Sequence, residues 1–431
     1  MKPILILMFF PVFSWAWQKA IWEWKEKTQD FLSNPYKQSR VPQFMLDAGH
    51  PWIIENREKL EQLPDVESYL CFSFQESAVD SSRVEGMAEK KGLEIPHNLF
   101  DHLEINNNRW EINRPGWPNA LMRMREINRC PAALSQVKTF KTRVYVYDSE
   151  YDDLAKKMLE PSRPPQELLG LFADVLGNMT SLETLKWSIP PPYVHYFQEH
   201  FVDRGLVLPS VKTLEISGRA HFLVPMCSNI TELEYGGRTT GERHTSGSED
   251  SESLLLQATM FAPNLTRFGM TASWAWDDSK LQELVSYMPG LTTLYLRGGL
   301  SSQHRYPGYD GPSGSRLRVS SLKNLTQLEL PPAYSLDLGW DGGPGCGNFY
   351  FGPGGRDFER QVYREGLETT EAAAAIVVEA LPRLTNFSIG DSQANITRYE
   401  NGTLWASFPW TGRLDEWVME ALPGGPDGPD W

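Results

Sequence analysis

The histidines that could support metal binding or catalysis are spaced too irregularly to form a familiar site. His195 and His200 are five positions apart on a predicted helix, so they do not share one face as a metal-binding pair four apart would. The chain contains no Gly-x-Ser-x-Gly nucleophile turn, no phosphate-binding loop and no dinucleotide-binding glycine pattern. The sequence therefore predicts no catalytic residues and no cofactor.

An acidic cluster surrounds Tyr151. It consists of Asp148, Glu150, Asp152 and Asp153. Oxygen ligands crowded on one loop would suit calcium. Carboxylates also gather at the start of a helix, where they interact favourably with its dipole. We expect the second arrangement, and we predict no metal site.

A segment rich in glycine and aromatic residues spans 334–355. Its aromatic rings could offer a stacking platform to a sugar or a partner protein, or they could pack the loop against the rest of the domain. Trp340 and Tyr350 are our candidate ligand-binding residues in this segment. Tyr235 and Tyr295 are the corresponding candidates on predicted strands.

Seven Asn-x-Ser/Thr sequons, more than composition predicts by chance, indicate glycosylation in a secretory pathway. Their asparagines are Asn178, Asn229, Asn264, Asn324, Asn386, Asn395 and Asn401. Several of them belong to a recurring Asn-Leu-Thr phrase. Asn395 and Asn401 lie outside that phrase and are the clearest candidates.

Four cysteines are present: Cys71, Cys130, Cys227 and Cys346. None has the Cys-x-x-Cys spacing of a zinc site. All four are disulfide candidates with three pairings open, and four buried free thiols are the alternative.

The first residues predict a signal peptide. Lys2 precedes an apolar run over 3–17, and Ser14 and Ala16 stand three and one positions before a cleavage point. A hydrophobic helix packed on the domain is the alternative. The run is too short to cross about 30 Å of hydrocarbon, and no later stretch is longer, so we expect no membrane span.

Composition limits the partners. The net charge is −14, and basic residues form no patch. Such a surface repels phosphate backbones, so we expect no nucleic-acid partner.

A short phrase recurs along the chain: an apolar residue, often followed by Pro, and two or three positions later a run of the form Leu/Val-x-x-Leu-x-Leu. Clear copies cover 208–216, 262–268, 288–296, 322–330 and 381–389. The earliest copy we accept is 63–69, and 100–105 holds a weaker one. In each phrase the two apolar residues two apart face one side of a short strand.

This alternation assigns each strand residue to a face. We expect the core to hold Leu214, Ile216, Leu294, Leu296, Leu328 and Leu330. The opposite, more open face then carries Glu215, Tyr295 and Glu329.

Helix-spaced apolar residues separate the phrases. We predict helices over 166–179, 193–202, 251–261, from 277 onward, and over 371–381. Strands that alternate with helices require a parallel sheet with helices on its outer face. The spacing between copies is irregular.

The phrases and their intervening helices resemble the divergent leucine-rich-repeat proteins abundant in filamentous fungi. The resemblance covers residues 60–400 and implies an α/β fold, an irregular leucine-rich-repeat solenoid with a curved parallel sheet. Many members carry an N-terminal F-box. This chain begins instead with a signal-like segment, and its first sixty residues lack the Leu-Pro-led F-box helices.

The predicted organisation follows from these observations. A signal peptide (1–16) and an N-terminal helical cap (17–60) precede the repeat region (61–400), which has insertions at 236–253 and 334–355; a C-terminal cap and tail (401–431) follows. We expect a secreted, glycosylated, non-catalytic binding protein for a protein or glycan ligand. An intracellular F-box-like adaptor and a secreted enzyme with an unrecognised site are the alternatives.

Overall fold

A computed structural model defines the fold. It describes residues 41–64, 66, 70, 92–96, 98–107, 116–144, 163–236, 248–271, 276, 278–298, 321–336, 338, 340, 343, 350 and 354–424. The predicted signal peptide and the acidic cluster at 148–153 lie outside these residues, as do Cys71 and Cys346.

The chain divides into two compact units, Met1–Leu99 and Phe100–Trp431. Within the described part of the first unit, helix α2 (Gln43–Ala48) is followed by helix α3 (Pro51–Leu60). Pro51 opens α3, and the His50 side chain caps it by accepting a hydrogen bond from the Trp52 N–H at 3.2 Å.

The second unit is a mixed α/β structure built on one large, mostly parallel sheet. Its strands are β1 (His102–Asn107), β2 (Thr139–Val144), β3 (Thr184–Ser188), β4 (Thr213–Ser217), β5 (Glu232–Gly236), β6 (Arg267–Thr271), β7 (Thr293–Arg297), β8 (Gln327–Leu330), β9 (Asn386–Ile389), β10 (Ser392–Arg398) and β11 (Leu404–Ser407). Eleven strands follow one another in chain order across the sheet. Strands β1 to β9 are parallel, and β10 and β11 continue the sheet in antiparallel pairing.

The register confirms the predicted strand alternation. Leu214 pairs with Leu233, and Leu294 pairs with Phe268 and Leu328, so equivalent phrase positions are neighbours in the sheet. The six leucine and isoleucine side chains expected in the core are all at most 2% exposed. Glu215 lies between the two buried residues of its strand and faces the opposite side.

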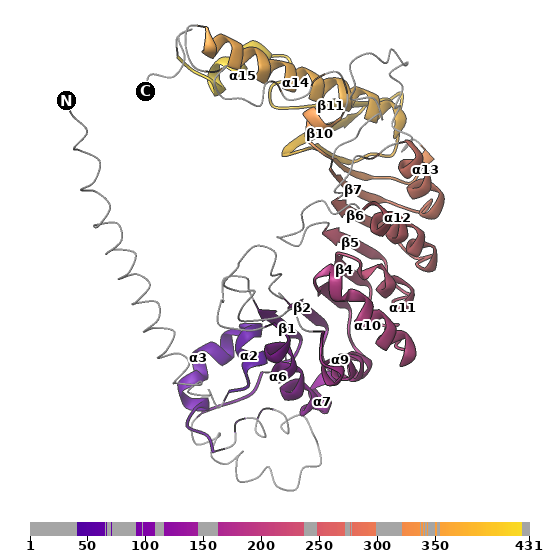
Figure 1. Cartoon of the computed structure of the whole chain (residues 1–431). Coiled ribbons are helices and arrows are strands. Elements are labelled where there is room, and N and C mark those ends of the chain that lie inside the picture. The colour runs from indigo at the N-terminus through magenta and orange to yellow at the C-terminus, as the bar shows by residue number, and fades with distance from the viewer. Residues whose placement is uncertain are drawn as a thin grey trace, which may run out of the picture. The chain divides into compact units, whose positions relative to one another are not determined.

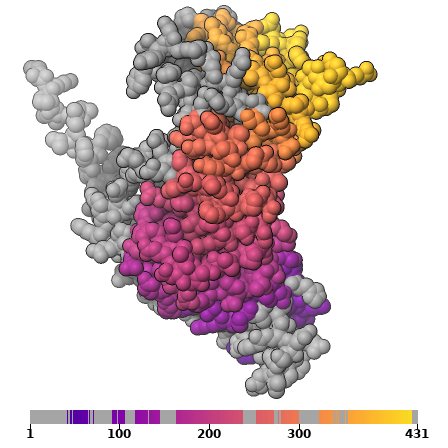
Figure 2. Space-filling model, turned by 90° about the vertical axis from the view of Figure 1, so that its right-hand side faces the viewer, coloured from indigo at the N-terminus to yellow at the C-terminus, as the bar shows by residue number. Residues whose placement is uncertain are grey.

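Helices connect the strands. They are α6 (Gly116–Asn128), α7 (Pro131–Leu134), α9 (Gln166–Asn178), α10 (Pro191–Asp203), α11 (Leu223–Met226), α12 (Ser248–Ala258), α13 (Asp278–Tyr287), α14 (Gly355–Ala380) and α15 (Leu414–Ala421). In Figure 1, α10 to α13 lie on one side of strands β4 to β7. Figure 2 faces this helical layer, where the colours follow one another in chain order from magenta to orange, as expected when successive helices lie side by side.

Aromatic side chains fill the space between this helical layer and the sheet near β3. The Trp187 ring contacts the rings of Phe172, Phe197 and Phe201 at centroid distances of 5.4, 5.5 and 5.6 Å. These residues come from β3, α9 and α10, and Trp187 is 1% exposed. Edge-to-face packing of this kind adds about 0.5–1.5 kcal/mol per pair beyond burial.

Two expectations require correction. The phrase at 63–69 is not a strand, because Val66 and Leu70 are helical. They lie four apart and are both buried, which is helical rather than strand spacing. The helix predicted over 371–381 is the end of α14, which begins at Gly355.

None of the helices in the described part of the chain is long and apolar enough to cross a membrane.

Candidate functional site

The open face of the parallel strands carries a row of charged side chains. At the central position of successive strands it reads Glu104, Lys141, Lys186, Glu215, Glu234, Gly269, Tyr295, Glu329 and Ser388. Neighbours of like charge occur twice in this row, at the two lysines and at the two glutamates that follow.

Each charge in the row turns toward an opposite one. Lys141 lies 2.9 Å from Glu104, and Lys186 lies 2.5 Å from Glu215, so the adjacent lysines pair in opposite directions. Burial alone would raise the pKa of Glu104, but hydrogen bonds from His102 and Lys141 hold that pKa below its ordinary value. Cross-strand pairs therefore fix the direction of these side chains.

Gly269 contributes no side chain to this row, and it is buried between its neighbours. A methyl group placed on Gly269 would lie 3.5 Å from both the Glu234 Cγ and the Tyr295 Cδ2, so these two side chains already close over the position. Across Gly269, Arg297 on β7 lies 3.6 Å from Glu234 on β5, two strands away. It also donates from Nε to Glu329 at 3.0 Å, and this hydrogen bond raises the pKa of Arg297.

Tyr295 stands at the centre of this cluster. Its ring is half-buried, and the Arg267 guanidinium lies over it at 5.0 Å from the ring centroid. Because Gly269 has no side chain, Glu234 and Tyr295 approach each other above it from the two neighbouring strands. We call Tyr295, Gly269, Arg267, Arg297 and Glu234 the Tyr295 cluster.

The other predicted strand tyrosine is not on this face. Tyr235 is 3% exposed and pairs in register with Ile216 and Met270 of the core. It stands two positions after the buried Leu233, so strand alternation turns it inward. The expectation that Tyr235 contacts a ligand on the open face is therefore wrong.

The two predicted loop aromatics lie against helix α14. A methyl group on Gly366 would lie 2.5 Å from the Trp340 ring, and the Tyr350 ring is 5.7 Å from that of Phe358. Both aromatic residues are half-buried. Within the described residues no contact joins either one to Tyr295, so the four candidates do not form one site.

The cysteines have different states. Cys130 is disulfide-bonded, whereas Cys227 is a free thiol, fully buried, and burial raises its pKa to about 12. Cys227 is therefore not a bridging cysteine, which corrects its assignment as a disulfide candidate. It stands at the end of α11 with apolar neighbours, where a small hydrophobic residue suffices.

All seven sequon asparagines are exposed. Three of them precede threonines that have a structural role. Just before each of the five strands β5 to β9, a threonine hydroxyl donates to the backbone carbonyl at the same position before the preceding strand. These bonds run from Thr231 to Lys212 (3.4 Å), Thr266 to Thr231 (3.3 Å), Thr292 to Thr266 (3.2 Å), Thr326 to Thr292 (3.1 Å) and Thr385 to Thr326 (3.0 Å).

This threonine ladder accounts for part of the sequon excess. It supplies the third residue of the sequons at Asn229, Asn264 and Asn324. Thr292 and Thr385 make the same bond with no asparagine two positions before them. The ladder therefore explains the threonines of these three sequons without glycosylation, but not those at Asn178, Asn386, Asn395 and Asn401.

The histidine pair considered for metal binding lies on α10. His195 is exposed, and its ring lies 3.9 Å from that of Tyr196 in a tilted arrangement, whereas the Nε2 atom of His200 is buried. Within the described residues, no group of three His, Cys, Asp or Glu side chains is arranged to hold a metal ion.

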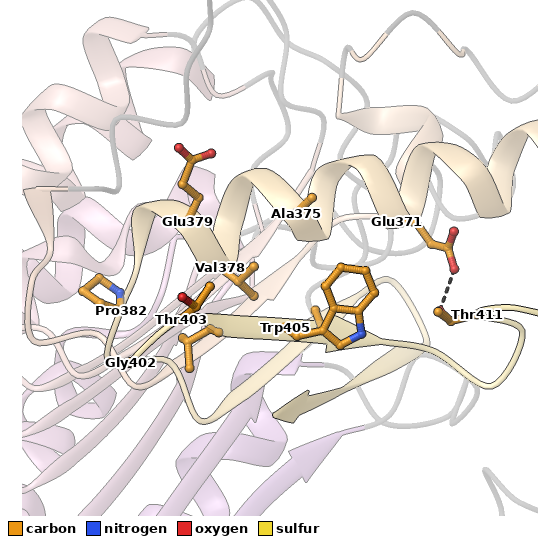
Figure 3. A pocket seen from close by; sticks show the side chains of 11 residues that line it. Glu371, Ala375, Val378, Glu379, Pro382, Gly402, Thr403, Trp405 and Thr411 are labelled. Atoms are coloured by element: carbon orange, nitrogen blue, oxygen red, sulfur yellow. Dashed lines mark hydrogen bonds between the residues drawn. The ribbon is translucent and has the colours of Figure 1, made fainter. Parts of the chain in front are cut away.

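A pocket of about 400 Å³ lies between α14 and β11 (Figure 3). Val378 and Leu404 form part of an apolar floor, and the half-exposed Trp405 ring stands between the helix and the strand. Glu371 accepts a hydrogen bond from the Thr411 hydroxyl at 2.6 Å, which holds that carboxylate at one end. An indole and carboxylates around an apolar floor would suit a small group that carries hydrogen-bond donors.

No family model matches the chain, and no curated protein matches it significantly.

Proposed function

We propose that this protein is a secreted, N-glycosylated leucine-rich-repeat protein that binds a protein partner through the open face of its parallel strands. Leucine-rich repeats stack short parallel strands so that each adds a few apolar side chains to a continuous core. The in-register phrases, with a threonine bond recurring before five of the strands, support this assignment.

The observation that carries the binding proposal is the Tyr295 cluster. Tyrosine and arginine are enriched among the few residues that supply most of the affinity of protein interfaces. Here Tyr295 lies under Arg267, with Arg297 on its own strand, beside Gly269. The ring is only half-buried, so a partner's side chain could contact its exposed part.

Preorganisation supports the same surface. Arg297 is held between Glu234 and Glu329, so it loses little conformational freedom when a partner binds. The row carries charges of both signs, which favours a partner with complementary charges over a uniformly basic or acidic one.

The binding test compares two tyrosine substitutions. Tyr295→Ala removes the proposed contact, and Tyr287→Ala removes a half-buried tyrosine from helix α13 on the other layer. Proteins captured by the wild type and by Tyr287→Ala, but not by Tyr295→Ala, are candidate partners.

The dissociation constant of such a purified partner is then measured for the wild type, Tyr295→Ala and Tyr287→Ala. We expect Tyr295→Ala to weaken binding by about 30-fold, as a hot-spot residue does. Equal affinity for the three proteins would contradict the proposed surface. A partner that proves to be a glycan would keep the surface but change the ligand class.

Secretion and glycosylation have a separate test. The mature chain should begin at Trp17, which N-terminal sequencing of the natural protein detects. Its mass should fall on enzymatic glycan removal. An unprocessed, unglycosylated chain would favour the intracellular adaptor.

A further inference from the structure

The hairpin between β10 and β11 ends in a tight turn of defined geometry. The turn covers Tyr399, Glu400, Asn401, Gly402 and Thr403. The Gly402 N–H donates to the Tyr399 carbonyl at 2.9 Å, and the Tyr399 N–H donates to the Thr403 carbonyl at 2.9 Å. Gly402 has a φ of +84°, the left-handed conformation that such a turn requires before the returning strand.

This turn brings a sequon and an aromatic ring together. Tyr399 and Thr403 directly follow the Arg398–Leu404 pair and continue its register by one position, so their side chains lie on the same side of the hairpin. The Asn401 Oδ1 accepts a hydrogen bond from the Thr403 N–H at 2.9 Å. That bond positions the asparagine beside Thr403 and leaves its Nδ2 unused.

The exposure of Tyr399 has no explanation within the fold. Its ring is 52% exposed, and among the described residues it makes no ring contact or side-chain hydrogen bond. Asn401 is likewise exposed. An amphipathic ring in this position is suited to cover the apolar face of a sugar while its hydroxyl stays in water.

Asn401 is the only sequon asparagine that has an aromatic residue two positions before it. The residues two positions before the other six asparagines are Leu176, Cys227, Ala262, Leu322, Leu384 and Gln393, none of them aromatic. The sequon at Asn395 lies in the same hairpin, on strand β10, and so provides an internal comparison.

We infer that Asn401 carries an N-linked glycan whose first N-acetylglucosamine packs its apolar face against the Tyr399 ring. This inference rests on the proposed passage through a secretory pathway. In the transfer, Nδ2 of Asn401 bonds to C1 of the sugar and loses one proton. The C1–O bond to a lipid-linked diphosphate donor breaks, and the diphosphate leaves.

The first experiment measures occupancy. The full chain is expressed through a eukaryotic secretory pathway, and glycopeptide mass spectrometry determines the occupied fraction at Asn401 and Asn395. Tyr399→Ala should lower occupancy at Asn401 alone. Tyr399→Phe, which keeps the ring, and Tyr334→Ala, which removes another half-exposed tyrosine, should leave it unchanged.

The second experiment tests the packing itself. An endoglycosidase that leaves one sugar on each asparagine should preserve the thermal midpoint, because the first sugar makes the contact. Complete removal by an amidase should lower the midpoint by about 1–2 °C, the scale expected for one aromatic packing interaction in a unit of this size. In Tyr399→Ala, complete glycan removal should lower the thermal midpoint by about 1–2 °C less than it does in the wild type, because the aromatic contact is already absent.

The outcomes separate the inference from the proposed function. Glycans at Asn395 but none at Asn401, or an equal loss of thermal midpoint in wild type and Tyr399→Ala, would overturn the inference and leave secretion intact. A chain with no glycan at any sequon would overturn both.

Discussion

The two faces of the parallel strands are built from alternate residues of the same phrases, yet they are stabilised in different ways. On the core face, Leu214, Leu294 and Leu328 are at most 2% exposed and lie in register across the sheet. On the open face, Lys186 and Glu215 form an ion pair whose members are each about two-fifths exposed. The core face depends on excluding water, whereas the open face remains hydrated.

The two faces therefore differ in how much their side chains contribute to the free energy of folding. Burial contributes about 25 cal/mol for each Å² of apolar surface removed from water. Exposed ion pairs contribute about 0–1 kcal/mol, because water already solvates both charges. The open face can therefore change its side chains at little cost in stability, as a surface that evolves toward a ligand must.

The largest expected effect is on the core face. Leu294→Ala should lower the free energy of unfolding by about 2–5 kcal/mol, because a cavity remains between neighbouring strands. Urea unfolding measures this loss. Leu254→Ala, at a leucine on α12 that is 43% exposed, is the control and should change stability by less than about 0.5 kcal/mol. Similar losses in both variants would remove the contrast between buried and exposed positions.

The core face was predictable because it depends on residue type and period alone. Apolar residues two apart, following an apolar residue and often Pro, predict the strands β4, β7, β8 and β9 with the correct inward side. The same rule places Tyr235 inward, so its aromatic ring is no argument for a place on the open face. The segment 63–69 has the residue types of the recurring phrase. Its apolar residues, however, are also spaced as on one face of a helix.

The second prediction concerns the threonine ladder at the strand entry. The Thr266 carbonyl accepts from the Thr292 and Thr293 N–H groups at 2.9 and 3.0 Å and from the Thr292 hydroxyl at 3.2 Å. Thr292→Val keeps the β-branched shape and removes only the hydroxyl. The carbonyl retains two donors, so the expected loss is about 0.5–1.5 kcal/mol in urea unfolding.

A matched variant sharpens this test. The Thr213 hydroxyl, on the open face of β4, has no hydrogen-bond partner among the described residues. Thr213→Val should therefore leave stability unchanged. An equal loss in both variants would indicate that the ladder bond contributes nothing beyond side-chain shape.

The third prediction uses pH at the N-terminal end of the open face. The pKa of Glu104 is held below its ordinary value of 4.5, because hydrogen bonds from His102 and Lys141 outweigh the effect of burial. A lowered pKa in the folded state contributes stability above the unfolded pKa, and this contribution disappears as pH falls through the folded value.

Glu104→Gln should therefore reduce stability by about 0.2–1 kcal/mol near pH 7 and by less near pH 3, which lies below the ordinary pKa of 4.5. Denaturant unfolding at both pH values measures the difference. A loss of the same size at both would show that the side chain acts through shape rather than charge.

The candidate site could not be predicted as a whole, because its geometry depends on strands far apart in the chain. Tyr295 was expected on the open face from strand alternation. The reach of Arg297 to Glu234 depends on Gly269 between them, and no local pattern links residues 234, 269 and 297. The hairpin β10–β11 does not follow from the recurring phrase either, because β10 carries few apolar residues.

The smallest expected effect tests the open face most directly. Lys186 Nζ lies 2.5 Å from Glu215, a distance that would suggest a strong pair if it were buried. Because both side chains remain in water, Glu215→Ala should cost less than about 0.5 kcal/mol, and added salt should shrink the cost further. Removal of the Glu215 carboxylate also leaves Lys186 without its partner beside Lys141. Because Lys141 is already paired with Glu104, the repulsion between the two lysines is limited. A double-mutant cycle with Lys186→Ala isolates the pair, and its coupling energy should stay below about 0.5 kcal/mol. A coupling comparable to the cost of Leu294→Ala would mean that the open face stabilises the fold as the core does, and the two faces would then differ only in chemistry.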